Sequence, residues 1–491
     1  MKKMIILLVV LLLTCGSALI TITTIVNAEK SRVNYEQNIL IGNYSQIEGL
    51  SVSFSCDLKE NLFWDITCKL GEEAKANSSF HFSRKAVHDD TLVGSIDMSV
   101  DFSAYLSKVM SNQTDNPQLK AHIEEFGLSM ENGSEKTLVV DISKYVDYYP
   151  FWAMVSIGDT GASWDGAEHW EDPLFEGTVE QFQKFFRIPV VDGHVLELVI
   201  EKDMEGKCHI GTVGSHGDDQ GIYLWTESLI TSDACYFIFP LEGDAGDLVD
   251  FGQVPGGYGL YRLNYRVDEM EQVHIDENAL ELAFSLSQTE EFCTMHVDEN
   301  EKTLYMVTYN ENEYDLWLYV IDMENMQLMQ RLNVYNSNQN PLWYAETFIY
   351  EDFIVLDFYK YFMETDSNGE YTDEVEDSKE YFTLLTKGED GKFKNEMIVP
   401  ALTDEVEKEN PYFYMRDARS WCWNGEQLVL TGMLTDSKRE SNGNFYIAVY
   451  EEDCVVHFSE YISSLHTGYS PNDYHYSCHL DEKSNRVFWE N

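Results

Sequence analysis

Two tryptophans surrounded by carboxylates form the first candidate site. The stretch 163–173 reads SWDGAEHWEDP and brings Trp164 and Trp170 close to Asp165 and Glu168. Aromatic rings flanked by carboxylates suit a sugar-binding site, and exposed tryptophans also anchor protein partners. We therefore predict a ligand-binding site formed by Trp164, Asp165, Glu168 and Trp170. In the alternative interpretation, both indoles fold back onto the core, as large apolar side chains commonly do.

The second candidate is an acidic stretch with the residue types of a calcium site. Residues 364–380 read ETDSNGEYTDEVEDSKE and contain eight acids and one lysine. In the register of a calcium-binding loop, Glu364, Asp366, Asn368 and Glu370 would supply oxygen ligands. The twelfth position, which normally carries glutamate, is Val375. Calcium is thus the one candidate cofactor, and a solvated acidic hairpin loop is the alternative.

A third motif involves catalytic chemistry but lacks its partner. Asp159-Thr160-Gly161 resembles the active-site turn of aspartic proteases. That chemistry requires two aspartates that share one proton, and therefore a second Asp-Thr/Ser-Gly turn. The chain has no second copy, because Asn368 displaces the glycine after Asp366-Ser367. We interpret the motif as a surface turn.

The charge of the chain limits its partners. It has 491 residues with 86 acidic and 33 basic side chains, a net charge of −53. This field repels the phosphates of nucleic acid and anionic lipid headgroups, but attracts cations and basic partners. Hydrophobic residues make up 44% and aromatic residues 13% of the chain, which is enough to form a folded core. We predict no nucleic-acid binding and a monomeric chain.

The N-terminus predicts export. Lys2 and Lys3 precede an uncharged run of 23 residues, 4–26, long enough to span a bilayer. Residues 1–28 are therefore expected to be a membrane anchor or a signal peptide cut after Ala28. The rest of the chain would then lie outside the cytoplasm, anchored or secreted, and touch the membrane only through this segment. Eight cysteines follow it, either as disulfides or as buried thiols.

Repeated hairpins are the main signal for the fold. Strand-type runs broken by turn residues occur at 231–237, 296–306, 350–355 and 423–429, and a related hairpin at 56–64. A second hairpin follows the later copies, starting at Leu260, Leu318, Tyr381 and Tyr446, and Leu196 starts a similar one. Successive starts are 64, 58, 63 and 65 residues apart. Two hairpins per period predict four strands per unit.

In this pattern the chain resembles the bacterial extracytoplasmic β-propeller repeat proteins, over residues 230–491 and 51–84. The resemblance implies an all-β propeller of six to eight four-stranded blades, with seven preferred. We expect this domain to span 33–491, with a helical insertion at about 99–130 that begins its second helix at Asn116-Pro117. The chain ends half a unit short, so residues 38–47 are expected to join 487–489 in one blade. The alternative is an N-terminal α+β domain over 33–215, followed by a smaller all-β domain.

These features predict an exported, non-catalytic binding or scaffold protein of the cell envelope. Its partner would be an envelope protein or a glycan. The alternative is a carbohydrate-active enzyme that uses the central face of the propeller. An enzyme should bring carboxylates with shifted pKa values together near the ring axis, whereas a binding protein should present a broad face.

Overall fold

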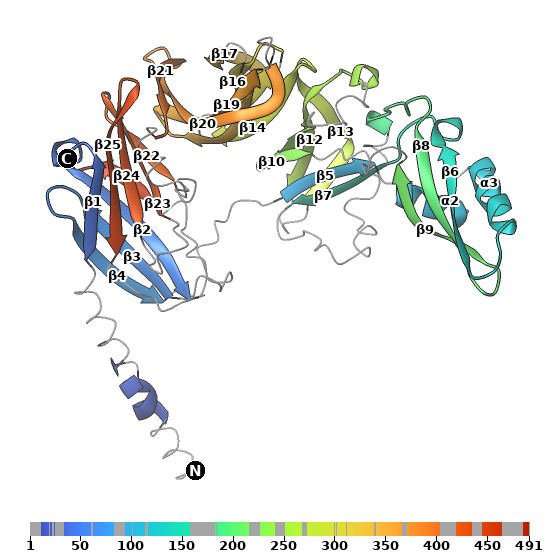
Figure 1. The fold of residues 1–491 in the computed structure, drawn as a ribbon, viewed down its shortest axis with the longest axis horizontal. Coiled ribbons are helices and arrows are strands. Elements are labelled where there is room, and N and C mark those ends of the chain that lie inside the picture. Colours follow the sequence, from blue (N-terminus) through green and yellow to red (C-terminus); the bar gives the residue numbers. More distant parts are fainter. Residues whose placement is uncertain are drawn as a thin grey trace. The chain divides into compact units, whose positions relative to one another are not determined.

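The computed structural model divides the chain into two compact units, Met1–Asp89 with Leu342–Asn491, and Asp90–Pro341. It describes residues 11–18, 20–21, 24, 34–59, 62–82, 94–100, 102–112, 116–157, 182, 184–215, 226–240, 251–267, 273–298, 300, 302–310, 312–337, 340–365, 371–402, 419–434, 444–463 and 485–490. Both units consist mainly of antiparallel sheets (Figure 1). The expectation of a predominantly β fold is therefore confirmed.

The first unit contains three sheets. One has the order β26 (Arg486–Trp489), β2 (Leu50–Lys59), β3 (Leu62–Lys69) and β4 (Lys75–Phe82). The next contains β18 (Leu342–Ile349), β19 (Phe353–Thr365), β20 (Tyr371–Lys387) and β21 (Phe393–Pro400). The third has five strands in the order β1 (Tyr35–Ile41), β25 (Cys454–Ser463), β24 (Phe445–Glu451), β23 (Gln427–Met433) and β22 (Ser420–Trp423).

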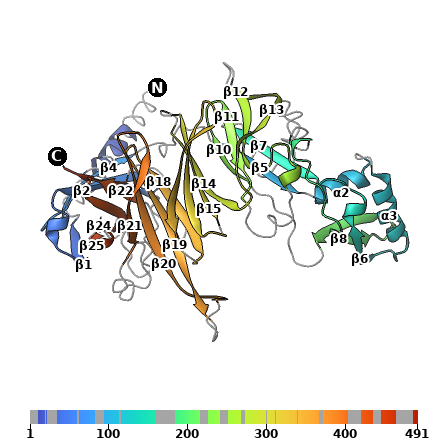
Figure 2. The same ribbon diagram turned by 90° about the horizontal axis from the view of Figure 1, so that it is seen from above.

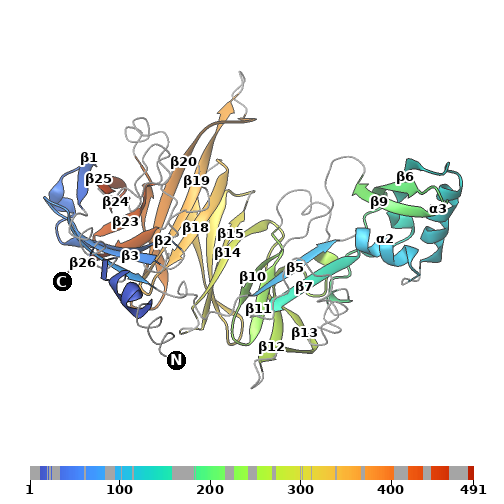
Figure 3. The same ribbon diagram turned by 90° about the horizontal axis from the view of Figure 1, so that it is seen from below.

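The two ends of the chain meet in this unit, but not as the sequence suggested. The C-terminal strand β26 pairs antiparallel with β2, from Leu50↔Trp489 to Ser53↔Arg486 (Figure 3). The expectation that residues 38–47 complete this sheet is wrong. Residues 35–41 instead form β1, which pairs with β25 in a different sheet. Leu50 and Val52 are fully buried and give β2 the apolar face that the sheet needs, whereas β1 is largely polar.

The second unit contains two four-stranded sheets and a smaller α+β part. The first sheet runs β10 (Glu227–Ile230), β11 (Ala234–Ile238), β12 (Gly259–Val267) and β13 (Val273–Ser285). The second runs β14 (Glu290–Asp298), β15 (Thr303–Asn310), β16 (Asp315–Asp322) and β17 (Gln327–Asn336). A two-stranded sheet of β5 (Gly94–Val100) and β7 (Phe151–Ile157) lies beside β10 (Figure 2).

The predicted hairpins of the repeat are confirmed, because their signals are local. The hairpins that start at Leu260, Leu318, Tyr381 and Tyr446 are β12–β13, β16–β17, β20–β21 and β24–β25. The turn between β16 and β17 shows how they reverse. Asp322 Oδ1 accepts a hydrogen bond from the Glu324 amide at 2.9 Å, and Met326 adopts a φ of 54°.

The helical insertion is larger than expected and includes a sheet. The helices α2 (Phe102–Met110) and α3 (Pro117–Leu128) pack with a three-stranded sheet of β6 (Ser134–Asp141), β8 (Val195–Lys202) and β9 (Cys208–Ser215). The hairpin predicted at Leu196 is thus confirmed, but it belongs to this sheet and not to a four-stranded unit. Asn116 caps α3 as expected, because its Oδ1 accepts from the Leu119 amide at 3.1 Å.

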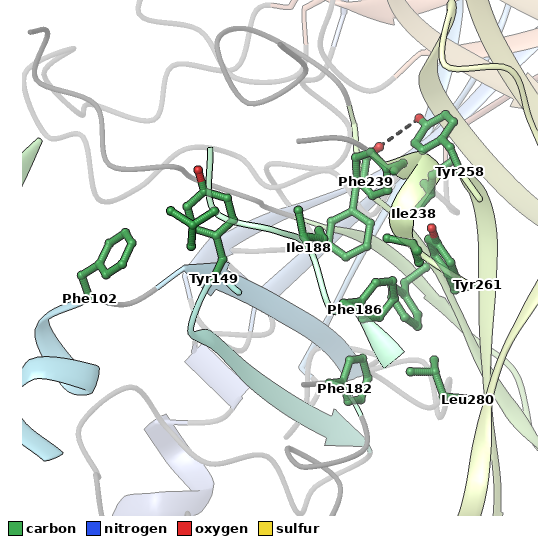
Figure 4. Packing of buried hydrophobic residues seen from close by; sticks show 14 of the residues in the cluster. Phe102, Tyr149, Phe182, Phe186, Ile188, Ile238, Phe239, Tyr258, Tyr261 and Leu280 are labelled. Carbon is green, nitrogen blue, oxygen red and sulfur yellow. Dashed lines mark hydrogen bonds between the residues drawn. The ribbon is translucent and has the colours of Figure 1, made fainter. Parts of the chain in front are cut away.

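An aromatic cluster holds the core of the second unit together (Figure 4). Phe186 packs edge-on against Tyr261 at 4.9 Å between ring centroids, and Tyr261 stacks on Phe237 at 5.5 Å. The Tyr258 hydroxyl is buried and donates to the Phe239 carbonyl at 2.9 Å. These rings join the segment before β8 to the sheet β10–β13, so the α+β part and this sheet share one core.

The N-terminal run is helical at residues 11–18. Among the described residues, no helix has both the length and the apolar character needed to cross a bilayer. Seven cysteines are described and all are free thiols, with Cys68 and Cys235 buried. Burial raises the pKa of both thiols to about 12, so they are unreactive core residues at neutral pH.

Candidate functional site

The strongest concentration of buried charge lies in the first unit, between the sheets β18–β21 and β22–β25. Arg419 immediately precedes β22 and reaches across to the neighbouring sheet. Its Nη1 donates to Asp357 Oδ2 of β19 at 2.5 Å, and its Nη2 donates to Glu380 Oε1 of β20 at 2.7 Å. The Arg419 and Asp357 side chains are each 1% exposed, and Glu380 is 14% exposed. We call Arg419, Asp357 and Glu380 the buried charge cluster.

Aromatic residues enclose the buried charge cluster. The Arg419 guanidinium lies 5.4 Å from the centre of the Phe382 ring, and Phe382 packs edge-on against Trp421 at 4.7 Å. Tyr446 of β24 is fully buried beside them. Gly432 faces Tyr446 across the β23–β24 pair, where a Cβ would lie 2.5 Å from the phenol oxygen. Glycine at this position therefore makes room for the ring.

Burial and charge together determine the protonation of this cluster. Burial raises the pKa of Asp357 well above its usual value, the charge of Glu380 raises it further, and Arg419 offsets part of the effect. Burial disfavours the charged form of Arg419, but Asp357 and Glu380 hold its pKa above the usual value. Asp357 Oδ1 is buried without a hydrogen-bond partner, so it is the oxygen free to carry a proton. One arginine and one ionised carboxylate then leave the core neutral.

The buried charge cluster lacks the geometry of a catalytic site. A catalytic acid or base must reach the substrate to within hydrogen-bond distance. Asp357 and Arg419 are closed off from solvent, and their charges are compensated internally. The arrangement can instead hold one end of β22 against β19 and β20, because each partner would be costly to leave alone in the core.

A second polar cluster lies in the other unit and reaches the surface. Glu290 at the start of β14 accepts from the Tyr319 hydroxyl at 2.5 Å and from Arg331 Nη2 at 2.6 Å. The Arg331 side chain is 38% exposed and its guanidinium stacks 3.9 Å above the Trp317 ring. Burial and the bond to Glu290 raise the pKa of Tyr319. This cluster neutralises a nearly buried carboxylate and exposes part of a cation.

The residues predicted from sequence to bind ligands lie mostly outside the description. Trp164, Asp165, Glu168 and Trp170 fall outside the described residues, as does Asp159. Asp366, Asn368 and Glu370 do so as well. The backbone of Glu364 belongs to β19, but its side chain is not described. Within the described ranges, no three His, Cys, Asp or Glu side chains are arranged to hold a metal ion.

The sequence analysis missed Arg419, Asp357 and Glu380. One signal was available: Asp357 interrupts the apolar run 353–358, FIVLDF, at a position that alternation assigns to the same face as Val355. A carboxylate on the inner face of a strand needs a partner. The pattern could not identify that partner, because Arg419 is 62 residues away in the chain.

Comparison with protein-family models and with curated proteins gives no match. Three solved structures show weak similarity. A protein from Lactobacillus plantarum has 8% identity and a TM-score of 0.25, with 55% of this chain and 74% of that chain covered. An oligogalacturonate lyase from Vibrio parahaemolyticus has 11% identity and a TM-score of 0.24, with 74% and 85% covered. The S. cerevisiae core factor has 7% identity and a TM-score of 0.21, with 88% and 62% covered. Similarity at this level assigns neither a family nor an activity to this chain.

Proposed function

We propose that the chain is an exported β-propeller of the cell envelope that works by binding and not by catalysis. Five four-stranded antiparallel sheets support the propeller, because four strands per repeated unit is the composition of a blade. The pair β5–β7 would belong to a sixth blade. This number lies at the lower end of the expected six to eight, below the preferred seven.

The observation that supports binding over catalysis is the state of the buried charge cluster. Asp357 has a strongly perturbed pKa, which is a common mark of an active site. The cause of the perturbation is burial in the core beside Arg419 and Glu380, and not exposure to a substrate. The charged group most altered by its surroundings therefore serves packing.

The partner we propose is an envelope protein or a glycan that carries positive charge. A net charge of −53 attracts basic groups over distances of about a Debye length and speeds their association. The candidate contact residues are those of the tryptophan–carboxylate stretch, Trp164, Asp165, Glu168 and Trp170. The candidate calcium ligands around Asp366 would contribute to stability and not to recognition. We propose that residues 1–28 anchor the domain or direct its secretion.

Binding of the purified full chain to isolated cell-wall glycan and to solubilised envelope proteins tests this proposal. We expect retention that weakens several-fold between about 50 and 500 mM NaCl, as screened charge interactions do. Replacing Trp164 and Trp170 together by alanine should reduce it further. The matched control is Trp343→Ala, which removes a 57% exposed tryptophan of β18.

Two outcomes would contradict the proposal. Release of new reducing ends from the glycan by the wild-type chain would support the alternative, a carbohydrate-active enzyme. Equal loss of retention in Trp343→Ala and in the double variant would show that the tryptophan–carboxylate stretch is not the contact. Location is tested separately: protease added to intact protoplasts should digest the chain, and full protection would exclude export.

A further inference from the structure

The strand β1 is an addition to a sheet that is complete without it. The sheet β22–β25 has four strands, like four other sheets among the described residues, and β1 pairs as a fifth along the edge of β25 (Figure 1). The pairing is antiparallel, from Tyr35↔Ser463 to Ile41↔Phe458, with a register shift between Ile39 and Ile41. β1 is also the first strand after the N-terminal apolar run. It therefore connects that run to the folded unit.

Polar contacts contribute much of the attachment of β1. Tyr35 is its one buried residue, and Ile39, Leu40 and Ile41 are only partly buried. Gln37 Nε2 donates to the Tyr461 hydroxyl at 2.9 Å, while Gln37 Oε1 is buried without a hydrogen-bond partner. An unsatisfied buried acceptor weakens an attachment, because the atom loses water and gains no bond.

Beneath β1, a row of polar side chains follows one face of β25. His457 Nε2 lies 2.9 Å from the Ser459 hydroxyl, and that hydroxyl donates to Tyr461 at 3.4 Å. All three side chains are fully buried. The turn after β1 closes over the imidazole, since a Cβ on Gly42 would lie 3.2 Å from His457 Nδ1. The turn must open before water can reach the imidazole.

We propose that β1 is an acid-sensitive latch: protonation of His457 releases β1 and its following turn, residues 35–49, from β25. A buried imidazolium lacks compensation here, because the strand β24 presents Val449, Ile447 and Phe445 to this face. Opening of the latch would expose the imidazole to water and remove the cost of burying its charge.

The titratable neighbours of His457 do not replace a counter-ion. On this face they are Tyr461, together with Cys68 and Tyr44, which act on Tyr461 electrostatically. Glu460 lies on the opposite face of β25, where it accepts from Asn38 at 3.3 Å. Burial lowers the pKa of His457 to about 4, and the backbone of Asn43 opposes part of this shift.

The consequence of opening is a longer tether. With the latch closed, six residues, 29–34, separate the apolar run from β1. With the latch open, 21 residues, 29–49, separate it from β2, and the maximum span rises from about 20 to about 70 Å at roughly 3.4 Å per residue. This extension rests on the proposed membrane anchor, whereas the latch itself does not. Mass analysis of the mature N-terminus distinguishes the two: a cut after Ala28 removes the anchor and leaves the latch to be tested.

Hydrogen exchange of the full chain between about pH 7 and pH 4, corrected for intrinsic rates, tests the latch. The opening constant of residues 35–41 should rise by up to about tenfold per pH unit below about 6.5, and by about 300-fold at pH 4. Residues 427–433 and 445–451, in β23 and β24 of the same sheet, should stay protected. Parallel loss of protection in β1, β23 and β24 would overturn the proposal, because the whole sheet would then be unfolding.

Two variants identify the group that titrates. His457→Gln should flatten the pH dependence of β1, whereas His296→Gln, at a half-buried histidine of β14, should leave it unchanged. An unchanged slope in His457→Gln would overturn the proposal. If that variant does not fold, Asn38→Cys with Glu460→Cys provides a second test, since these residues face each other across β1 and β25. The oxidised pair should abolish acid-induced exchange in 35–49, and reduction should restore it. Acid-induced exchange that persists in the oxidised pair would likewise overturn it.

Discussion

Replacement of Arg419 by methionine should destabilise the first unit strongly and in a pH-dependent way. Methionine keeps much of the volume but removes the donors to Asp357 and Glu380. Both carboxyls lose their cation, and Asp357, at 1% side-chain exposure, cannot recover water in the folded state. Glu380, at 14%, can be partly hydrated. Removing one partner of a buried pair typically costs about 3 to 5 kcal/mol.

The cost of leaving Asp357 unpaired has an upper bound, because the carboxyl can take up a proton instead. That proton costs about 1.4 kcal/mol for each pH unit above the unfolded pKa of about 3.9, or about 5 kcal/mol at about pH 7.5 and about 1.5 kcal/mol at about pH 5. The folded pKa of Asp357 is already raised in the wild type and rises further in the variant. A raised carboxyl pKa means that the folded state binds more protons. The variant should therefore gain stability relative to wild type as the pH falls.

Urea unfolding at about pH 7.5 and about pH 5 measures both effects, with an expected loss of about 3 to 5 kcal/mol that falls by more than half at the lower pH. Adding Asp357→Asn to the variant should remove this pH dependence, because the amide does not titrate. Arg486→Met makes the same change at an exposed position of β26 and should cost less than about 0.5 kcal/mol. A loss below about 1 kcal/mol at the higher pH, or one that is equal at both, would refute the account of Asp357 as a costly buried acid.

Three further predictions address the helix, the latch and the surface charge. Asn116→Ala removes the cap of α3 and should lower the free energy of unfolding by about 1 kcal/mol in urea titrations, and no change would show that the cap is dispensable. Gly42→Ala should release β1 in hydrogen exchange, because the residue has a φ of 76° and its Cβ would lie 2.3 Å from the Val456 carbonyl oxygen. Gly391→Ala has a similar φ of 77° but open space, and should leave β1 protected; equal effects would assign the loss to backbone strain alone. Sodium, magnesium and calcium chloride should all raise the melting temperature by screening the net charge of −53, whereas a rise with micromolar calcium alone would indicate the predicted site near Asp366.

The sequence by itself determined the elements whose causes are local. Alternating apolar residues and the turn residues between them predicted the hairpins that start at Leu260, Leu318, Tyr381 and Tyr446, and all are present. Asn116 and Pro117 predicted the start of α3 to the residue. These predictions succeed because a turn or a cap depends on hydrogen bonds between residues only two or three positions apart.

The tertiary structure alone decided how strands from distant parts of the chain pair. Residues 38–47 and the strand β26 were expected in one sheet, but β1 pairs with β25 while β26 pairs with β2. Both short strands have the alternation of an edge strand, and that pattern does not specify which edge they join. The choice depends on the packed faces of complete sheets, here the buried side chains of β2 and β24.

The buried charge cluster was likewise decided by the assembled fold. Arg419 meets Asp357 and Glu380 across separations of 62 and 39 residues. Among 86 acids in the sequence, nothing local marks these two as partners of one arginine. They pair because packing two sheets face to face removes all three groups from water. At that point an unpaired charge would cost several kcal/mol, so compensation becomes necessary only in the folded unit.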